Sequence, residues 1–302
     1  MKVFVDGSAG TTGLEIVSRL EARKDVELIS LAEESRKDPA ARKEAIRSSD
    51  LTVLCLPDEA AVEAVAFAEG SDVKIIDAST AHRVSPDFVY GFPELAGQRE
   101  KIRTAKRVAN PGCHASGFIA LVYPLVAAGV LDKEAPLSAF SLTGYTGGGK
   151  KMIREYEESA GALAAPRQYA LTQKHKHLKE MVAVTGISRP PIFLPVVADF
   201  PRGMQVSVPL SLDWLSCGAE RIKEIYRELY RGGVVRYADC EESYLSASMM
   251  AGKDGMTISL FGNEERLVAV ASFDNLGKGA SGAAIQNMNL MLGADEVTGL
   301  SL

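Results

Sequence analysis

The residue best placed for covalent chemistry is Cys113. It follows Asn110-Pro111-Gly112 and precedes an apolar run that predicts a helix beginning near Ala115. Aligned N–H groups at a helix N-terminus stabilise a thiolate and offer donors to an oxyanion. Cys113 is therefore the candidate nucleophile. The other cysteines, Cys55, Cys217 and Cys240, form no C-x-x-C pair and lie far apart, which indicates neither a zinc site nor a disulfide framework.

Two of the four histidines stand together in Lys174-His175-Lys176-His177. Histidine exchanges protons near neutral pH, and flanking cations favour its neutral form and attract an anion. We expect one of His175 and His177 to act as the acid/base, and the sequence leaves open which. No acidic or thiol ligand has a plausible spacing with this pair, so we expect no metal site.

A glycine-rich loop follows the first β-rich run, Lys2–Val5, and leads directly into a predicted helix. Its sequence is Gly7-Ser8-Ala9-Gly10-Thr11-Thr12-Gly13. Glycines spaced in this way let the backbone turn tightly and approach a pyrophosphate, whose charge then meets the N–H groups at the start of the helix. The loop predicts a dinucleotide site, although the spacing differs from the commoner G-x-G-x-x-G.

The segment after the second β-rich run should lie near the cofactor's ribose, and it reads Glu33-Glu34-Ser35-Arg36. An acidic residue there would accept a hydrogen bond from the 2′-hydroxyl of NAD, whereas Ser35 and Arg36 would hold the 2′-phosphate of NADP. Both options are present, and we favour NADP.

Cationic side chains for a phosphate and a carboxylate are available near these motifs. Arg202 lies between two predicted strands, where its fork of donors would face a bound anion, although an exposed hairpin arginine is an equally good interpretation. We expect substrate contacts from four residues: Arg83, Asn110, Lys150 and Arg202.

The elements that must position these residues follow two patterns. In the first hundred residues, short β-rich runs alternate with amphipathic stretches, which predicts βαβ units and a parallel sheet covered on both faces. From about Leu137 the strands become longer and alternate, which is typical of a mixed sheet in an α+β domain. A closing helix, Ala280–Leu292, is expected to return to the first domain. In the first helix, Leu14, Val17 and Leu20 predict one apolar face.

The fold class is therefore α/β, with a Rossmann-like parallel-sheet dinucleotide domain and an α+β catalytic domain built on a mixed sheet. We place residues 1–112 with 280–302 in the first domain and residues 113–279 in the second. A chain of 302 residues is long enough for two cores.

The composition narrows the choice of partners to small molecules and other copies of the chain. The net charge is -5 and no uninterrupted basic cluster occurs, so nucleic acid is not expected. The apolar run from Phe118 is shorter than the ~18 residues of a membrane span. The N-terminus shows no signal core, so we expect a cytoplasmic protein. A homo-oligomer is expected, although its size is left open.

Several segments together resemble one family, the shorter form of the N-acetyl-gamma-glutamyl-phosphate reductases of arginine biosynthesis, within the aspartate-semialdehyde dehydrogenase superfamily. They occur in the family's order over nearly the whole chain. The matching segments are Val5–Gly13, Asp77–Arg83, Tyr90–Leu95, Asn110–Cys113, His175–His177 and Asp274–Gly282.

The resemblance implies that Cys113 is the nucleophile, that the His175/His177 pair transfers protons, and that Asn275 and the turn from Gly279 lie near the nicotinamide. Residues 144–150 depart from the pattern of the longer form, which leaves the role of Lys150 open. The implied reaction is the NADP-dependent reduction of N-acetyl-L-glutamyl 5-phosphate to the 5-semialdehyde, with release of phosphate, through a thioester on the cysteine.

Two alternatives share this chemistry, namely semialdehyde dehydrogenases that act on aspartate or on an aminoadipate derivative. A cofactor-binding regulatory protein without catalysis is a further alternative. A substrate panel separates the enzymes from one another, and turnover itself separates them from the regulator.

Overall fold

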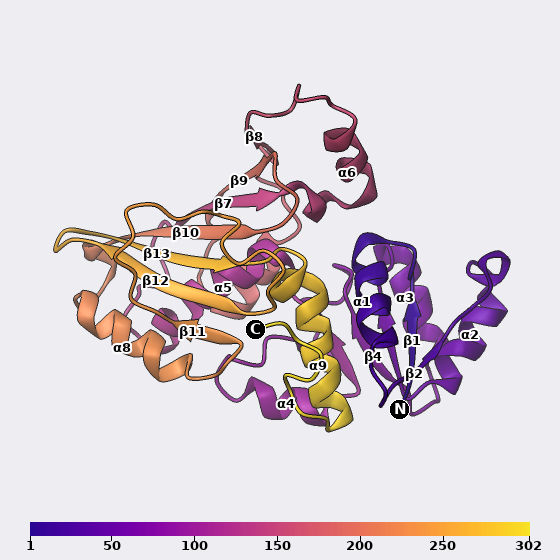
Figure 1. Cartoon of the computed structure of the whole chain (residues 1–302). Helices are drawn as coiled ribbons and strands as arrows, with labels where there is room; N and C mark the ends of the chain where they lie inside the picture. Colours follow the sequence, from indigo (N-terminus) through magenta and orange to yellow (C-terminus); the bar gives the residue numbers. More distant parts are fainter. The chain divides into compact units, whose positions relative to one another are not determined.

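The computed structural model describes all 302 residues, and the chain forms two compact units. Unit 1 comprises Met1–Pro111 and Ala280–Leu300, and unit 2 comprises Gly112–Gly279 and Ser301–Leu302. Unit 1 is therefore built from two separate stretches of the chain (Figure 1).

Unit 1 contains a six-stranded sheet in the order β2-β1-β3-β4-β6-β5. Every pairing in it is parallel, as the alternating pattern predicted. Its strands are β1 (Lys2–Asp6), β2 (Glu27–Ile29), β3 (Leu51–Leu54), β4 (Lys74–Asp77), β5 (Val89–Tyr90) and β6 (Arg107–Ala109).

Helices cover both faces of this sheet, and each face has its own apolar core. One core joins α1 (Thr11–Glu21), α4 (Gln98–Thr104) and α9 (Gly282–Leu292) to the sheet. The other core joins α2 (Pro39–Ser48) and α3 (Asp58–Phe67) to the opposite face. The closing helix α9 packs in unit 1, where Ile285 and Met288 share a core with residues of β1 and β3.

One detail of α1 differs from the sequence prediction. Leu20 is buried and Val17 packs on the same core, but Leu14 is 49% exposed and Ile16 takes the buried position. A strict spacing of three residues drifts around a helix that has 3.6 residues per turn, so Leu14 does not share the face of Leu20 and Ile16.

Unit 2 contains a seven-stranded mixed sheet in the order β11-β12-β13-β10-β7-β9-β8, as expected for the α+β domain. Its strands are β7 (Ser138–Gly144), β8 (Arg167–Gln168), β9 (Ile192–Ala198), β10 (Met204–Ser211), β11 (Val235–Tyr237), β12 (Met256–Gly262) and β13 (Arg266–Phe273). Its helices are α5 (Cys113–Ala127), α6 (Gly149–Glu157), α7 (Leu178–Thr185) and α8 (Ala219–Leu229).

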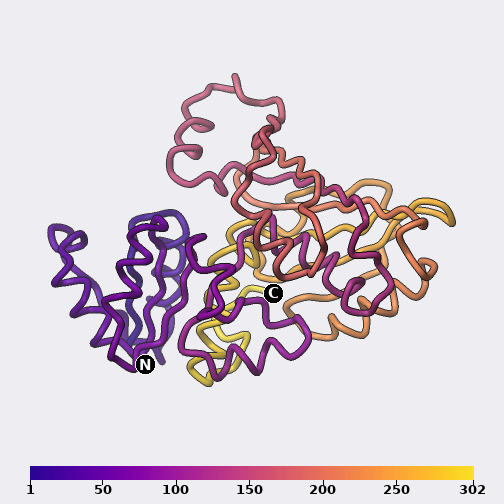
Figure 2. Tube along the Cα trace, turned by 180° about the vertical axis from the view of Figure 1, so that it is seen from behind, coloured from indigo at the N-terminus to yellow at the C-terminus, as the bar shows by residue number.

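Three of these helices lie on one face of the sheet. α5 packs on β10 and β13, and both α7 and α8 contact α5. α6 differs, because it contacts mainly the short turn Tyr145–Gly148 before it, and both views show this segment projecting from the sheet (Figures 1 and 2). We call residues 145–157 the α6 arm.

The opposite face of the sheet carries apolar side chains without a covering helix. Val206 of β10 faces α5, so its neighbour Ser207 points the other way. Phe140 is paired with Ser207 and therefore lies on that second face, and Ile192 lies on it two positions along the same register. Both are exposed large hydrophobic residues. We call this surface the open face.

No helix in the structure is both long enough and apolar enough to cross a membrane.

Candidate functional site

The glycine loop of unit 1 has the backbone geometry that a phosphate requires. Gly7 has a φ of +85°, and a Cβ there would clash with the carbonyl of Cys55. A Cβ on Gly13 would clash with the carbonyl of Gly7. Larger residues would therefore open the loop, and glycine keeps it tight.

The start of α1 is left without a capping side chain. Gly10 is the N-cap residue and supplies none, and the hydroxyl of Thr11 is buried without a hydrogen-bond partner. Uncapped N–H groups at the positive end of a helix form an anion site. These residues fit the pyrophosphate of a dinucleotide, and Ser8, Ala9 and Thr12 complete the same loop and first turn.

A buried ion pair fixes the strand end from which the loop departs. Arg42 donates to Asp6 at 3.0 Å and to Glu63 at 2.6 Å, so it links β1, α2 and α3. Burial raises the pKa of Asp6, and the charge of Arg42 opposes that rise. Ser35 ends a short helical turn after β2, and Arg36 follows it on the surface.

Cys113 is the first residue of α5, two positions earlier than the sequence predicted. Gly112 is the N-cap in an extended conformation, which starts the helix immediately after it. A Cβ on Gly279 would lie 2.9 Å from the Cβ of Cys113, so glycine lets the turn Gly277–Ser281 approach the cysteine closely. The cysteine is only partly buried.

The two predicted histidines lie in the same unit as the cysteine, next to a buried carboxylate. Glu180 accepts a hydrogen bond from the backbone N–H of Gly112 at 3.1 Å. Another oxygen of the same carboxylate lies 4.0 Å from His177 Nε2. The His175 ring is 4.6 Å from the His177 ring, and His175 Nδ1 accepts from the backbone N–H of His177. One carboxylate thus connects the residue before the nucleophile to a histidine.

A further histidine, His114, is buried beneath this cluster. Its Nδ1 lies 2.7 Å from the Ser141 hydroxyl and its Nε2 lies 2.6 Å from the Tyr169 hydroxyl. Burial, assisted by the neighbouring charge of His175, lowers the pKa of His114 to about 3. His114 is therefore neutral at physiological pH.

The segment that carries the histidines is anchored through Gln173. Its side-chain amide donates to the carbonyl of Phe193 and accepts from the N–H of Phe193, both at 2.8 Å. Gln173 and Ala170 have φ values of 56° and 51°, in the left-handed region that is strained for residues other than glycine. The paired amide offsets this strain.

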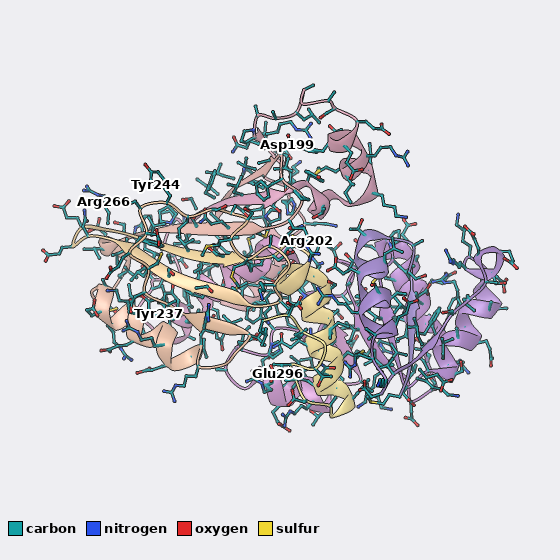
Figure 3. All side chains as sticks on the ribbon, viewed as in Figure 1. Asp199, Arg202, Tyr237, Tyr244, Arg266 and Glu296 are labelled. Atoms are coloured by element: carbon teal, nitrogen blue, oxygen red, sulfur yellow. The ribbon has the colours of Figure 1, made fainter.

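Arg202 is placed at the turn between β9 and β10 (Figure 3). Its Nε donates to Asp274 at 2.8 Å. Asp274 is fully buried and also accepts from the backbone N–H groups of Leu276 and Gly277. Asn275 accepts from the N–H of Gly203 and donates to Thr146, so it joins the same turn to the base of the α6 arm.

The remaining predicted substrate residues are spread over both units. Arg83 and Asn110 belong to unit 1, where Arg83 donates to the carbonyls of Asn110 and Ala78. His82, beside Arg83, lies 2.6 Å from the buried carboxylate of Asp77. Lys150 is exposed on the α6 arm. Unit 2 therefore brings together Cys113, His175 and His177, while Lys150 lies on a projecting segment.

Glu180, Tyr169 and Gln173 were not predicted from the sequence. The spacing of Glu180 could have predicted its place beside His177, because the two residues are three positions apart at the start of a helix. Tyr169 and Gln173 have no such signal, since their contacts depend on the pairing of distant strands. No group of three or more His, Cys, Asp or Glu side chains has the geometry of a metal site.

A phosphate loop on a parallel sheet, together with a cysteine at the first position of a helix in an α+β unit that also carries two histidines, defines a dinucleotide-dependent enzyme of the semialdehyde dehydrogenase class. Comparison with family models agrees. The model described as "Semialdehyde dehydrogenase, NAD binding domain" matches residues 2–105, and "Semialdehyde dehydrogenase, dimerisation domain" matches residues 113–275.

Solved structures share the fold at low sequence identity. Aspartate semialdehyde dehydrogenase II from Vibrio cholerae superposes with a TM-score of 0.74 at 15% identity, covering 96% of this chain and 98% of that one. The enzyme from Francisella tularensis also gives 0.74 at 15% identity, covering 97% and 100%.

Curated relatives are much closer in sequence. N-acetyl-gamma-glutamyl-phosphate reductase 2 of Nostoc sp. (strain PCC 7120) is 45% identical, covering 99% of both chains. N-acetyl-gamma-glutamyl-phosphate reductase of Brucella ovis is 48% identical, covering 97% of this chain and 99% of the relative. The chain belongs to the N-acetyl-gamma-glutamyl-phosphate reductase family, and the resemblance seen in the sequence is confirmed.

Proposed function

We propose that the protein reduces N-acetyl-L-glutamyl 5-phosphate to N-acetyl-L-glutamate 5-semialdehyde with release of phosphate, as a step of arginine biosynthesis. The observation that carries this proposal is the Glu180 carboxylate, which holds the N-terminus of the Cys113 helix and lies beside His177. A nucleophile, a base and an orienting carboxylate in one unit are the parts that acyl transfer to sulfur requires.

In the proposed mechanism His177 takes the proton of the Cys113 thiol, and Glu180 stabilises the imidazolium that forms. The sulfur attacks the acyl carbon, the carbon–sulfur bond forms, and the bond to the phosphate oxygen breaks. The N–H groups at the start of α5 stabilise the developing oxyanion. When bound, a reduced nicotinamide cofactor supplies the hydride that converts the thioester to the oxidation level of an aldehyde. The carbon–sulfur bond then breaks, and His177 returns the proton to the sulfur.

The nucleophile is tested by Cys113→Ser, with Cys217→Ser as the matched control. We expect Cys113→Ser to abolish phosphate-dependent reduction of NADP by the semialdehyde and to leave dinucleotide affinity, measured by fluorescence titration, within about twofold. Cys217→Ser should retain full activity. Substantial turnover by Cys113→Ser would refute the assignment of the nucleophile.

The substrate is tested by a panel of semialdehydes assayed under the same conditions. The proposal expects the highest kcat/KM with the N-acetylglutamate derivative. A higher kcat/KM with aspartate semialdehyde or with an aminoadipate derivative would show that the protein has one of those two alternative activities.

We infer that NADP is preferred over NAD, on the strength of Ser35 and Arg36 beyond the end of β2. A guanidinium pairs well with a 2′-phosphate. Arg36→Ala should therefore raise KM for NADP about tenfold or more and change KM for NAD little, and Lys24→Ala, an exposed change elsewhere in unit 1, should change neither. Equal effects of Arg36→Ala on the two cofactors would contradict the inference.

Arg83, Asn110, Lys150 and Arg202 are proposed to contact the substrate, and Asn275 and Gly279 to lie near the nicotinamide. Arg202 is the best supported of the cations, because the buried Asp274 fixes its orientation. We further propose a homo-oligomer that associates through the open face, because Phe140 and Ile192 expose apolar surface there.

A further inference from the structure

A row of three hydrogen-bonded side chains passes through His114, which follows Cys113 in the chain. It runs from Ser141 on β7 through His114, the residue after the nucleophile, to the hydroxyl of Tyr169. Burial raises the pKa of Tyr169, and the negative charge of Cys113 raises it further. The Tyr169 ring also lies 6.2 Å from the His175 ring, so Tyr169 belongs to the cluster of side chains around the start of α5.

The direction of the hydrogen bonds in this row follows from the protonation state of His114. Because its imidazole is neutral, it has one N–H and one acceptor nitrogen. The Ser141 hydroxyl is fully buried and has no partner other than His114 Nδ1. Ser141 must therefore donate to Nδ1, since a buried hydroxyl hydrogen without an acceptor is costly. The proton of His114 then resides on Nε2, which donates to the Tyr169 oxygen.

This arrangement leaves the Tyr169 hydrogen directed away from His114. His114 is the only hydrogen-bond partner of the Tyr169 hydroxyl in the structure. The phenol accepts one hydrogen bond and can donate another, and the bond that it accepts polarises its O–H and strengthens it as a donor. His175 and Phe193 pack against the His114 ring and hold the row in place.

We propose that Tyr169 is a further catalytic residue, whose hydroxyl donates a hydrogen bond to the acyl oxygen when the Cys113 sulfur adds to the acyl carbon. His114 and Ser141 are positioning residues that direct this donor. The proposal rests on the proposed thioester chemistry. The structure shows no hydrogen bond between the Tyr169 hydroxyl and the Cys113 sulfur. When the sulfur has added to the acyl carbon, the acyl oxygen is two bonds away from the sulfur. A donor that meets charge only in the transition state accelerates the chemical step.

The test compares two reactions of Cys113 that need no cofactor and no natural substrate. In the first, p-nitrophenyl acetate acylates the thiolate: the carbon–sulfur bond forms, negative charge develops on the carbonyl oxygen, and p-nitrophenolate departs with its electron pair. In the second, iodoacetamide alkylates the thiolate by displacement of iodide, and no oxyanion forms. Both are followed at Cys113, by the p-nitrophenolate burst and by peptide mass spectrometry.

We expect Tyr169→Phe to slow acylation about a hundredfold and to change alkylation by less than about twofold. Ser141→Ala should slow acylation by a smaller factor, again without slowing alkylation, because His114 can then place its proton on either nitrogen. Tyr230→Phe is the matched control: it removes a buried phenol hydroxyl that donates to the carbonyl of Ala120 in α5, and both rates should remain those of the parent.

An acylation rate that Tyr169→Phe leaves unchanged would overturn the proposal. Equal losses of acylation and alkylation would also overturn it, because they would show damage to the thiolate instead of loss of an oxyanion donor. If Tyr169→Phe does not fold, as judged by circular dichroism, the ratio of the acylation rate to the alkylation rate in Ser141→Ala is used instead. An unchanged ratio would then overturn the proposal. A parent protein that is acylated normally but does not turn over the proposed substrate would refute that substrate and leave this test intact.

Discussion

The imidazole of His114 is kept neutral by its burial, and this has a consequence for stability as well as for hydrogen bonding. In the folded protein its pKa is lowered from 6.5 to about 3. Between those two values the unfolded chain binds a proton at this residue and the folded chain does not. The stability that depends on neutral His114 is therefore complete above about pH 6.5 and is lost progressively as the pH falls.

We expect the free energy of unfolding to decline more steeply with acidification in the parent than in His114→Gln. One site that binds a proton only in the unfolded state contributes up to about 1.4 kcal/mol per pH unit. Urea unfolding at several values between about pH 4.5 and 7 measures the slope for each protein. Parallel slopes would show that His114 is not the group responsible, whatever the difference in absolute stability.

The single residues that could be predicted from the sequence are recognisable by the residues next to them. Cys113 follows Asn-Pro-Gly, and Gly7, Gly10 and Gly13 repeat at a fixed interval. Glu180, Tyr169 and Ser141 are ordinary residue types, and only the folded chain brings them into hydrogen-bonding distance of Gly112 and His114. Burial, which lowers the pKa of His114 and keeps its imidazole neutral, is also a property of the folded chain.

The segment that carries His175 and His177 is a strained element that the Gln173 side chain ties to β9. Ala170 and Gln173 have left-handed backbones, and the two hydrogen bonds from the Gln173 amide to Phe193 tie the segment to β9. A left-handed residue other than glycine costs about 1–2 kcal/mol. Two such residues cost about 2–4 kcal/mol, and the two amide hydrogen bonds, at about 1 kcal/mol each, offset part of that cost.

Gln173→Ala should lower the free energy of unfolding by about 2 kcal/mol, because two hydrogen bonds of about 1 kcal/mol each are lost. It should also reduce kcat, because the histidines lose their anchor. Urea unfolding and steady-state assays provide the two measurements. Gln168→Ala, an exposed change on the neighbouring β8, should alter neither, and a similar effect of both substitutions would argue against a specific anchor.

At the level of elements, the sequence pattern identified most of the strands and helices and missed several short ones. The parallel sheet was predicted because short β-rich runs alternate with amphipathic stretches, and the mixed sheet and α9 were predicted from longer apolar patterns. β8 has two residues and α7 has eight, which is too few for the recurrence of apolar residues to indicate a strand or a helix. The start of α5 was placed two residues late because an N-cap glycine in an extended conformation carries little sequence signal.

In the molecule as a whole, the open face is the surface through which we propose that copies of the chain associate. Phe140 and Ile192 project from a sheet that is covered by helices on its other side only. Exposed apolar patches of this kind mark association surfaces, and the family model that covers unit 2 is described as a dimerisation domain.

Phe140→Glu should dissociate the proposed oligomer, because association would bury an unpaired carboxylate in an apolar surface. Size-exclusion chromatography with light scattering over a range of concentrations measures the mass. Val62→Glu, which changes an exposed apolar residue of α3 in unit 1, should leave the mass as in the parent. A parent protein that is monomeric at all concentrations would refute association through the open face.

The division of unit 1 between two distant stretches of the chain sets an order of events during synthesis. One face of its sheet packs against α9, which is synthesised about 170 residues after the last strand of that sheet. Until α9 is made, Val3, Val5 and Leu51 lack part of the apolar surface that buries them in the folded unit. The sheet of the nascent chain is therefore prone to aggregation while the intervening 168 residues of unit 2, Gly112–Gly279, are synthesised. A fragment ending at Pro111 is accordingly expected to aggregate, whereas the same fragment joined by a short linker to residues 280–300 should fold.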